Sequence, residues 1–313
     1  MIEVKNITKK YGKAVAVDNI SFNIEDGEIV GLLGPNGAGK STTMNIITGF
    51  IEQTEGDVII DGYNTLKKPK KAKKEIGYMP EGVPLYTDLT VKEFVSYMAE
   101  IKQVNKKERK EKVEKIIKKT GLKDVEKKLI KNLSRGYKQR VSMAGALVGE
   151  PKILILDEPT VGLDPKQITE IRSMIKELGK EHTIILSSHI LSEVSQICNK
   201  VIIINKGKIV AIDTPENLEN KVTKNNCIYV TVEDKENRVD EIKDKIEDIQ
   251  KIELVEENED GTKQYLIEAE KDKDIRKTIF AEFAKENITI FEMKKADTTL
   301  EDAFMKLIEG GNK

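Results

Sequence analysis

The sequence predicts an α/β protein with a mostly parallel core sheet, followed by a small α+β domain. An apolar strand pattern at 29–33 leads into a glycine-rich turn and a helix start. Two further apolar runs, 152–157 and 183–187, flank a helical pattern at 166–180. Strands that alternate with helices form mostly parallel sheets, which bind ligands at the carboxyl ends of their strands. The length of 313 residues also exceeds one average domain.

The chain begins with a β-rich part. Residues 2–7 and 18–24 have strand patterns on either side of a turn at 10–12, and residues 56–61 form another short strand pattern. A stretch with six lysines follows at 67–74. Such a run could face anionic lipid, but more often it is a solvated surface, and the second interpretation is favoured here.

A helical subdomain is expected at about 83–150. Thr90 and Glu93 have the spacing of a capping box that opens an amphipathic helix. Apolar residues recur at helical spacing in 91–103 and 107–119, and another helix begins at 133–134. After the parallel strands, the sequence predicts a hairpin at 201–212 and a short helix from Pro215. The first domain, 1–222, is expected to end with this helix.

Residues 223–313 have an order of their own. Their patterns follow the order strand, helix, strand, strand, helix, strand, which is the βαββαβ order of ferredoxin-like domains. A final amphipathic helix is expected at 299–309. The predicted strands are 227–233, 251–256, 263–269 and 288–293, and the predicted helices are 238–248 and 273–286. This domain is expected to be accessory or regulatory, since it contributes none of the motifs discussed below.

Composition limits the possible functions. Cys198 and Cys227 lie far apart without clustered histidines, so neither a disulfide framework nor a zinc site is indicated, and a reducing compartment is expected. No signal peptide or 18-residue apolar span is evident, so we expect a soluble chain. Net charge is −9 in residues 216–313 and +8 in residues 1–215. A total of −1 and the absence of Trp argue against a primary nucleic-acid role.

The turn after residues 29–33 has the features of a phosphate cradle. Gly34, Gly39, Lys40 and Ser41 fit the pattern G-x-x-x-x-G-K-[ST], with the preceding strand that this motif requires. Backbone N–H groups of such a loop converge on a phosphate, which the following helix start also attracts. The alternative is a strand, turn and helix whose glycines serve only packing. The expected binding residues are Gly34, Pro35, Asn36, Gly37, Ala38, Gly39, Lys40, Ser41 and Thr42.

Each polar side chain of this motif suggests a specific task. Lys40 would reach the β- and γ-phosphates, and the Ser41 hydroxyl would bind Mg²⁺. Asp157 ends the apolar run 152–157, and Glu158 follows it directly. A carboxylate at a strand end can hold Mg²⁺, while its neighbour deprotonates the water that attacks the γ-phosphate. A paired acidic surface turn is the alternative, but it does not require an apolar run before it.

Together these motifs resemble the ATP-binding subunits of ABC transporters over residues 1 to about 222. Residues 133–140, LSRGYKQR, are similar to the family's signature, and residues 161–164, VGLD, to its D-loop. Asp157 and Glu158 are similar to its second nucleotide motif, and His189 in LSSHI to its switch histidine. Tyr11 is similar to its adenine-stacking aromatic residue. His182 matches no motif and is expected on the surface.

The resemblance implies that one ATP and its Mg²⁺ are held between two nucleotide-binding domains. Ser134 and Gly136 begin a helix that offers a second anion site, and Asp164 of the D-loop is also expected to bind the nucleotide. Glu158 and His189 would be catalytic. Each chain has one such domain, so we expect a homodimer or a heterodimer with a homologue, bound to a separate transmembrane permease. The protein would then be cytoplasmic, peripheral on the inner face of the cell membrane.

Two residues depart from the family pattern. Arg135 stands where the signature most often has glycine, and Glu81 where the Q-loop usually has glutamine. Arg135 can point outward while Ser134 and Gly136 face the ligand. Glu81 would add negative charge near Mg²⁺ and the γ-phosphate, so its catalytic role, metal contact or water positioner, stays open. Both departures resemble the exporter branch with separately encoded membrane subunits, of drug or sodium export type.

Two other functions compete with a transporter motor. A soluble ATPase of the same superfamily could act on ribosomes or DNA, but those relatives generally carry two nucleotide domains or a long coiled-coil insertion, and neither is found in this sequence. A nucleotide-regulated binding module without turnover is hard to reconcile with both Glu158 and His189. The leading prediction is therefore an ATPase that couples hydrolysis to export.

Overall fold

The computed structural model describes residues 1–82, 85–222, 226–234, 238–242, 245–246, 248–258, 261–269 and 274–295. The chain divides into two compact units, Met1–Pro215 and Glu216–Lys313. The sequence places the boundary near residue 222, after the short helix α8 (Pro215–Val222). The structural division falls instead at the start of α8. None of the helices in the described ranges is long and apolar enough to cross a membrane.

The first unit is built on a six-stranded sheet with the order β10-β9-β3-β8-β7-β6. All neighbouring strands from β9 to β6 pair in parallel, and only β10 is antiparallel. The predicted mostly parallel core sheet is therefore confirmed. The strands are β3 (Ile29–Leu33), β6 (Ile76–Met79), β7 (Ile153–Leu156), β8 (Thr183–Ser188), β9 (Lys200–Asn205) and β10 (Lys208–Asp213).

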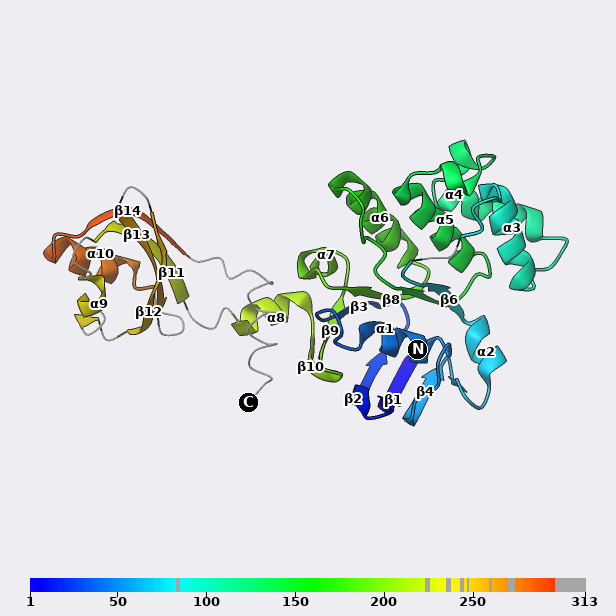
Figure 1. The fold of residues 1–313 in the computed structure, drawn as a ribbon, viewed down its shortest axis with the longest axis horizontal. Helices are drawn as coiled ribbons and strands as arrows, with labels where there is room; N and C mark the ends of the chain where they lie inside the picture. Colours follow the sequence, from blue (N-terminus) through cyan, green and yellow to red (C-terminus); the bar gives the residue numbers. More distant parts are fainter. Residues whose placement is uncertain are drawn as a thin grey trace. The chain divides into compact units, whose positions relative to one another are not determined.

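A second, antiparallel sheet forms the β-rich part of the unit. Its order is β2-β1-β4-β5, with β1 (Ile2–Tyr11), β2 (Ala14–Ile24), β4 (Glu55–Ile60) and β5 (Tyr63–Asn64). Helix α1 (Lys40–Ile47) lies between the two sheets (Figure 1). Met44, Ile46 and Ile47 are fully buried there, in one apolar cluster with residues of both sheets. This packing fixes the start of α1 beside the end of β3.

Helices gather beyond β6 in the region predicted as helical (Figure 1). They are α3 (Val91–Ile101), α4 (Arg109–Lys119) and α5 (Arg135–Leu147), with short 3₁₀ turns at Lys123–Val125 and Ile130–Asn132. The capping box is present: the Glu93 N–H donates to Thr90 Oγ1, and the Thr90 N–H to the Glu93 carboxylate. Helix α6 (Pro165–Leu178) connects β7 to β8, and the short helix α7 (Leu191–Ser195) follows β8.

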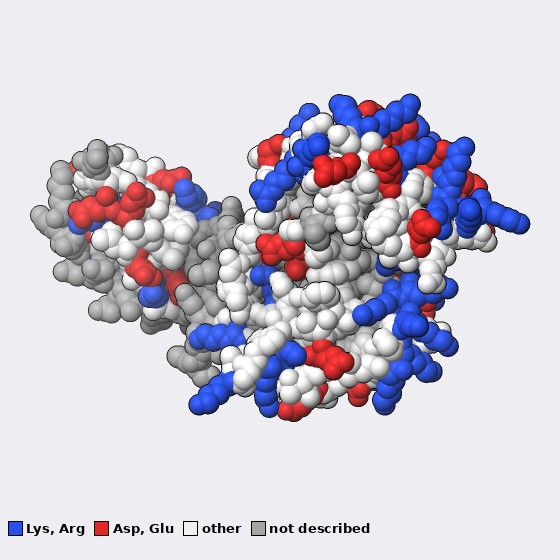
Figure 2. Space-filling model, turned by 45° about the vertical axis from the view of Figure 1, so that its right-hand side comes forward, with Lys and Arg blue, Asp and Glu red and all other residues white. Residues whose placement is uncertain are grey.

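The lysine-rich stretch includes a helix, α2 (Pro69–Lys74), that the sequence patterns do not predict. Pro69 occupies the first helical turn, and Ala72 is its buried residue. All six lysines at 67–74 are exposed. Figure 2 shows Lys and Arg side chains along the side of this unit on which Figure 1 places α2 and α3.

The second unit contains a four-stranded antiparallel sheet with the order β12-β13-β11-β14. This strand order, with helices after the first and third strands, is the predicted βαββαβ arrangement. Helix α9 is described over Val239–Ile242 only, shorter than the predicted 238–248, and the predicted helix 299–309 lies outside the described residues. The elements are β11 (Asn226–Glu233), α9, β12 (Ile249–Glu257), β13 (Thr262–Ala269), α10 (Arg276–Lys285) and β14 (Thr289–Lys295).

Candidate active site

The glycine-rich loop between β3 and α1 forms the floor of a cavity of about 450 Å³. Gly39 has φ of +107°, and a Cβ there would lie 2.7 Å from the Ala16 carbonyl oxygen. At Gly34, a Cβ would lie 2.2 Å from the Ile204 carbonyl oxygen of β9. Larger residues at either position would therefore displace the loop. The cavity is lined by Ala16, Asn36, Gly37, Ala38, Gly39, Lys40, Ser41, Thr42, Glu81, Glu158, Val161 and His189.

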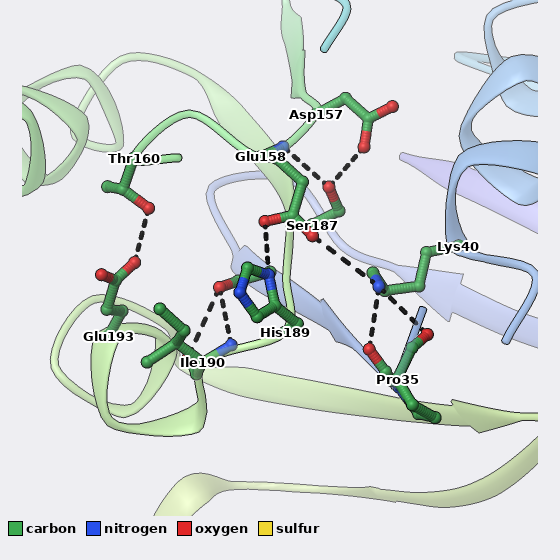
Figure 3. Close-up of polar contacts among 11 residues, drawn as sticks. Pro35, Lys40, Asp157, Glu158, Thr160, Ser187, His189, Ile190 and Glu193 are labelled. Atoms are coloured by element: carbon green, nitrogen blue, oxygen red, sulfur yellow. Dashed lines mark hydrogen bonds and ion pairs between the residues drawn. The ribbon is translucent and has the colours of Figure 1, made fainter. Parts of the chain in front are cut away.

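Lys40 begins α1, and its side chain turns back across the loop (Figure 3). Its Nζ donates to the carbonyl oxygen of Gly34 at 2.8 Å and to that of Pro35 at 3.3 Å. The same Nζ lies 3.7 Å from Glu158 Oε1, and both side chains are buried. These contacts hold the Lys40 ammonium at the cavity, where its positive charge favours the binding of an anion.

Asp157 and Glu158 follow β7 and lie beside the end of β8. Ser187 of β8 donates its hydroxyl hydrogen to Asp157 Oδ1 at 2.5 Å and accepts from the Glu158 N–H at 2.9 Å. Both carboxylate residues are buried, with 3% and 6% of their surface exposed. One serine thus orients both members of the acidic pair.

Glu158 also reaches the histidine predicted from the sequence. His189 Nδ1 lies 3.0 Å from Glu158 Oε2, and the two residues follow β7 and β8, which pair in parallel (Figure 3). The backbone of Glu158 has φ of +48°, in the left-handed region. Such a conformation costs a non-glycine residue about 1 to 3 kcal/mol, and it is often found at functional sites. The turn therefore directs the Glu158 carboxylate into the cavity.

Tyr78 of β6 lies close enough to Asp157 to feel its negative charge. Tyr78 of β6 donates its hydroxyl hydrogen to Asn45 Oδ1 at 3.1 Å. Burial, together with the negative charge of Asp157, raises the pKa of Tyr78 to about 12. Burial also raises the pKa of the Cys198 thiol. Neither group ionises near neutral pH, so neither supplies a proton acceptor there.

The residues of the signature and the D-loop lie at a second cavity, of about 240 Å³. Ser134 caps α5 by accepting from the Tyr137 N–H at 3.4 Å, and Asp164 caps α6 by accepting from the Gln167 N–H at 2.9 Å. Gly136 is buried against Gln167. None of the residues that line this cavity lines the cradle cavity as well. The structure therefore groups Ser134, Gly136 and Asp164 but separates them from Lys40 within one chain.

The two departures from the family pattern lie at a third cavity, of about 370 Å³. Glu81 and Arg135 line it together with Lys138 and Glu158. Glu81 also lines the cradle cavity, so the two spaces adjoin. Arg135 is exposed, and its guanidinium group covers Gly162 in the D-loop.

Tyr11 ends β1 and is 51% exposed. The Lys9 Nζ lies 5.0 Å from the centre of its ring. Tyr11 is not among the residues that line the cradle cavity, although Ala16 of the adjacent strand is. Its predicted stacking role stays a prediction.

Several residues at the site were not predicted from the sequence. Ala16 lines the cradle cavity, and Ser187 orients the acidic pair. Ser187 could have been noticed as a polar residue at the end of a parallel strand. Thr160 donates its hydroxyl hydrogen to Glu193 at 2.5 Å, a contact between distant segments that no local motif marks.

The donor set fits a magnesium ion. Ser41 and Asp157 offer hydroxyl and carboxylate oxygens, the ligand type that Mg²⁺ prefers. Within the described residues, no group of three or more His, Cys, Asp or Glu side chains could hold a metal. Mg²⁺ at nucleotide sites needs no such group, because phosphates and waters supply most of its ligands.

Known proteins resemble this chain in sequence and in structure. The family model described as "ABC transporter" matches residues 17–161. The linearmycin resistance ATP-binding protein LnrL of Bacillus subtilis is 37% identical over 74% of this chain and 75% of its own length. The bacitracin transport ATP-binding protein BcrA of Bacillus licheniformis is 35% identical over 99% of this chain and 98% of its own.

Solved structures agree with these relatives. An ATP-binding subunit of an ABC transporter matches with a TM-score of 0.64 and 30% identity, over 71% of this chain and 93% of that one. A dimeric ATP-binding cassette in a post-hydrolysis state, bound to ADP and phosphate, matches with a TM-score of 0.62 and 30% identity, over 68% of this chain and 98% of that one. The chain belongs to the ABC transporter family, in which it is an ATP-binding subunit.

Proposed function

We propose that this subunit hydrolyses MgATP at the cradle cavity and thereby drives export through a separately encoded membrane subunit. The observation that carries this proposal is the convergence of three side chains at the phosphate end of the cradle. Glu158 lies within 3.7 Å of the Lys40 ammonium and within 3.0 Å of the His189 imidazole. A base, a cation and an orienting histidine at a glycine-rich loop suit phosphoryl transfer to water.

The chain's own groups divide the work of hydrolysis. Glu158 accepts a proton from the attacking water as the water oxygen bonds to the γ-phosphorus and the bond to the β–γ bridging oxygen breaks. ADP and inorganic phosphate result. Lys40 and the loop N–H groups offset the phosphate charge, and His189 orients the Glu158 carboxylate. Ser41 and Asp157 would hold Mg²⁺, which would supply further charge neutralisation.

The reaction requires a second subunit in this proposal. Ser134, Gly136 and Asp164 line a cavity distinct from the cradle of their own chain. They would bind the γ-phosphate held by the cradle of a partner, so that each ATP lies between two subunits. ATP then binds the closed dimer more tightly than the open monomers, and hydrolysis removes this difference. The partner is a second copy or a homologue.

The names of the relatives support a proposal for the membrane partner and the cargo. The names of the related proteins refer to linearmycin resistance, bacitracin transport and lantibiotic transport. We infer a role in exporting an antimicrobial compound, with this subunit on the cytoplasmic face of the membrane. The relatives do not favour the alternative of a soluble ATPase that acts on ribosomes or DNA. The βαββαβ unit, which lacks the nucleotide motifs, would be accessory and regulatory.

Reconstitution tests this function. The subunit and the membrane protein that co-purifies with it would be inserted into lipid vesicles, with ATP supplied on the side of the subunit. We expect ATP-dependent movement of bacitracin or a related antimicrobial peptide, and none with Glu158→Gln. ATP hydrolysis without a co-purifying membrane protein, together with ribosome binding, would contradict the exporter assignment.

A further inference from the structure

A buried hydrogen bond next to the acidic pair is not used by the proposed mechanism. Thr160 Oγ1 donates to Glu193 Oε2 at 2.5 Å, and the two residues are only 6% and 8% exposed (Figure 3). Hydrogen bonds to a carboxylate are stronger than those between neutral groups, especially where water is excluded. This hydrogen bond therefore stabilises the contact between the two chain segments that carry Thr160 and Glu193.

This hydrogen bond lies close in the sequence to the contact between Glu158 and His189. Thr160 follows Glu158 by two residues, and Glu193 follows His189 by four. The Thr160 to Glu193 bond and the Glu158 to His189 bond thus join the same two segments, as Figure 3 shows. The position of one bond restricts the other, because the chain between them is short.

The histidine lies in a short connection between two elements. The His189 side chain is 43% exposed and lies between the end of β8 and the start of α7. Ser188 Oγ accepts from the Ile190 N–H at 3.0 Å, which orders only the turn. Helix α7 packs on β3 through Val194, for which the missing Cβ of Gly31 leaves room. Apolar packing of this kind is not directional, whereas the hydrogen bond of Glu193 is.

We propose that Thr160 and Glu193 are positioning residues that hold His189 at the correct place beside Glu158. This inference rests on the proposed roles of Glu158 and His189 in hydrolysis. Neither Thr160 nor Glu193 lines the cradle cavity, so they act through the histidine and not on the nucleotide. Loss of the bond lets α7 shift on β3, and the imidazole then leaves its contact with the Glu158 carboxylate.

Steady-state kinetics of Thr160→Val test this role. Valine keeps the shape of threonine but lacks the hydroxyl donor. We expect kcat to fall about tenfold or more, with the KM for ATP and nucleotide affinity within about twofold, because orientation contributes to the transition state more than to binding. Thr160→Ser should restore most of the turnover. Thr169→Val, at an exposed threonine of α6, is the matched control and should behave as wild type.

A double variant separates positioning from stability. Thr160→Val leaves a buried carboxylate unpaired, which destabilises the fold. Thr160→Val with Glu193→Met replaces both partners by apolar groups of similar shape and should recover the melting temperature while kcat stays low. If kcat recovers together with the melting temperature, the pair is only structural and the proposal is wrong.

Combining Thr160→Val with a variant of His189 tests whether Thr160 acts through the histidine. In a His189→Ala background, Thr160→Val should cause little further loss of kcat, because the residue that it positions is already absent. A full additional tenfold loss would overturn the proposal. Failure of the proposed function is distinguishable: Glu158→Gln would then keep wild-type turnover, whatever the result at Thr160.

Discussion

His189 Nδ1 lies 3.0 Å from Glu158 Oε2, and Glu158 Oε1 lies 3.7 Å from the Lys40 ammonium. One buried carboxylate thus contacts both Lys40, the proposed phosphate-binding residue, and His189, which follows the neighbouring strand β8. This placement supports the proposed role of Glu158 in hydrolysis more than in binding, since Lys40 and the loop amides are the proposed anion site.

Glu158→Gln should slow ATP hydrolysis by roughly 10²-fold or more while ATP still binds. The amide has nearly the shape of the carboxylate but cannot accept the proton of the attacking water. Single-turnover hydrolysis and binding of a fluorescent ATP analogue measure the two effects separately. Lys40→Ala is the control with the opposite pattern, because it weakens the phosphate contacts themselves. Wild-type single-turnover hydrolysis by Glu158→Gln would refute the assignment.

Dimerisation of the ATP-bound Glu158→Gln protein should depend on Ser134. Ser134 is exposed at the start of α5 and lines the second cavity. Ser134→Arg places bulk at this cavity, so we expect a monomer where Glu158→Gln alone forms a dimer. Light scattering at saturating ATP decides between the two states. Ser173→Arg, at an exposed serine of α6, is the matched control and should leave the dimer intact.

The cradle could be predicted from the sequence because the residues that form it lie close together along the chain. A strand, a glycine-rich turn and a helix start lie within 29–43, and Asp157 with Glu158 directly follows an apolar strand. The capping box of Thr90 is similarly local. Such motifs need no knowledge of distant neighbours, since hydrogen bonding and backbone geometry are decided within a few residues.

Other features depend on tertiary contacts. Helix α2 is almost entirely polar, and α7 has only five residues, so neither has an apolar period long enough to detect. Ser187 and Glu193 reach the acidic turn only because β7 and β8 pair in parallel. The separation of Ser134 from the cradle of its own chain likewise emerges only once the helices are packed.

Stability near pH 6 should depend on His182. Its Nδ1 lies 2.8 Å from the Pro151 carbonyl oxygen, and burial lowers the pKa of this imidazole below its ordinary value of 6.5. Between the lowered pKa and 6.5, the unfolded chain binds more protons than the folded one, so the free energy of unfolding falls as the pH decreases.

Thermal unfolding at pH 7.5 and pH 5.5 tests this expectation. His182→Gln removes the titrating group, so we expect a smaller loss of melting temperature on acidification than in the wild type. A loss of stability that is equal at both pH values does not affect the comparison, which concerns only the difference in melting temperature. Equal losses in the two proteins would show that other groups govern the acid dependence.

Glu81 should affect coupling to the membrane subunit more than nucleotide binding. It is exposed in the segment that leads from β6 toward the helical region, and it lines both the cradle cavity and the adjoining one. Arg135 and Lys138 line the adjoining cavity, and within the described residues none of the three side chains forms an ion pair. These charges are therefore available to respond when the γ-phosphate arrives or leaves.

Glu81→Ala should keep ATP affinity within about threefold, since Lys40 and the loop amides bind the phosphates. Stimulation of ATP hydrolysis by the membrane partner should nevertheless decrease, because the charge that links the nucleotide state to the helical region is lost. Glu81→Gln, which keeps the shape and removes only the charge, distinguishes the two contributions: if stimulation falls as in Glu81→Ala, the charge carries the coupling. Equal stimulation of Glu81→Ala and the wild type, measured with the reconstituted membrane partner, would exclude a coupling role for this residue.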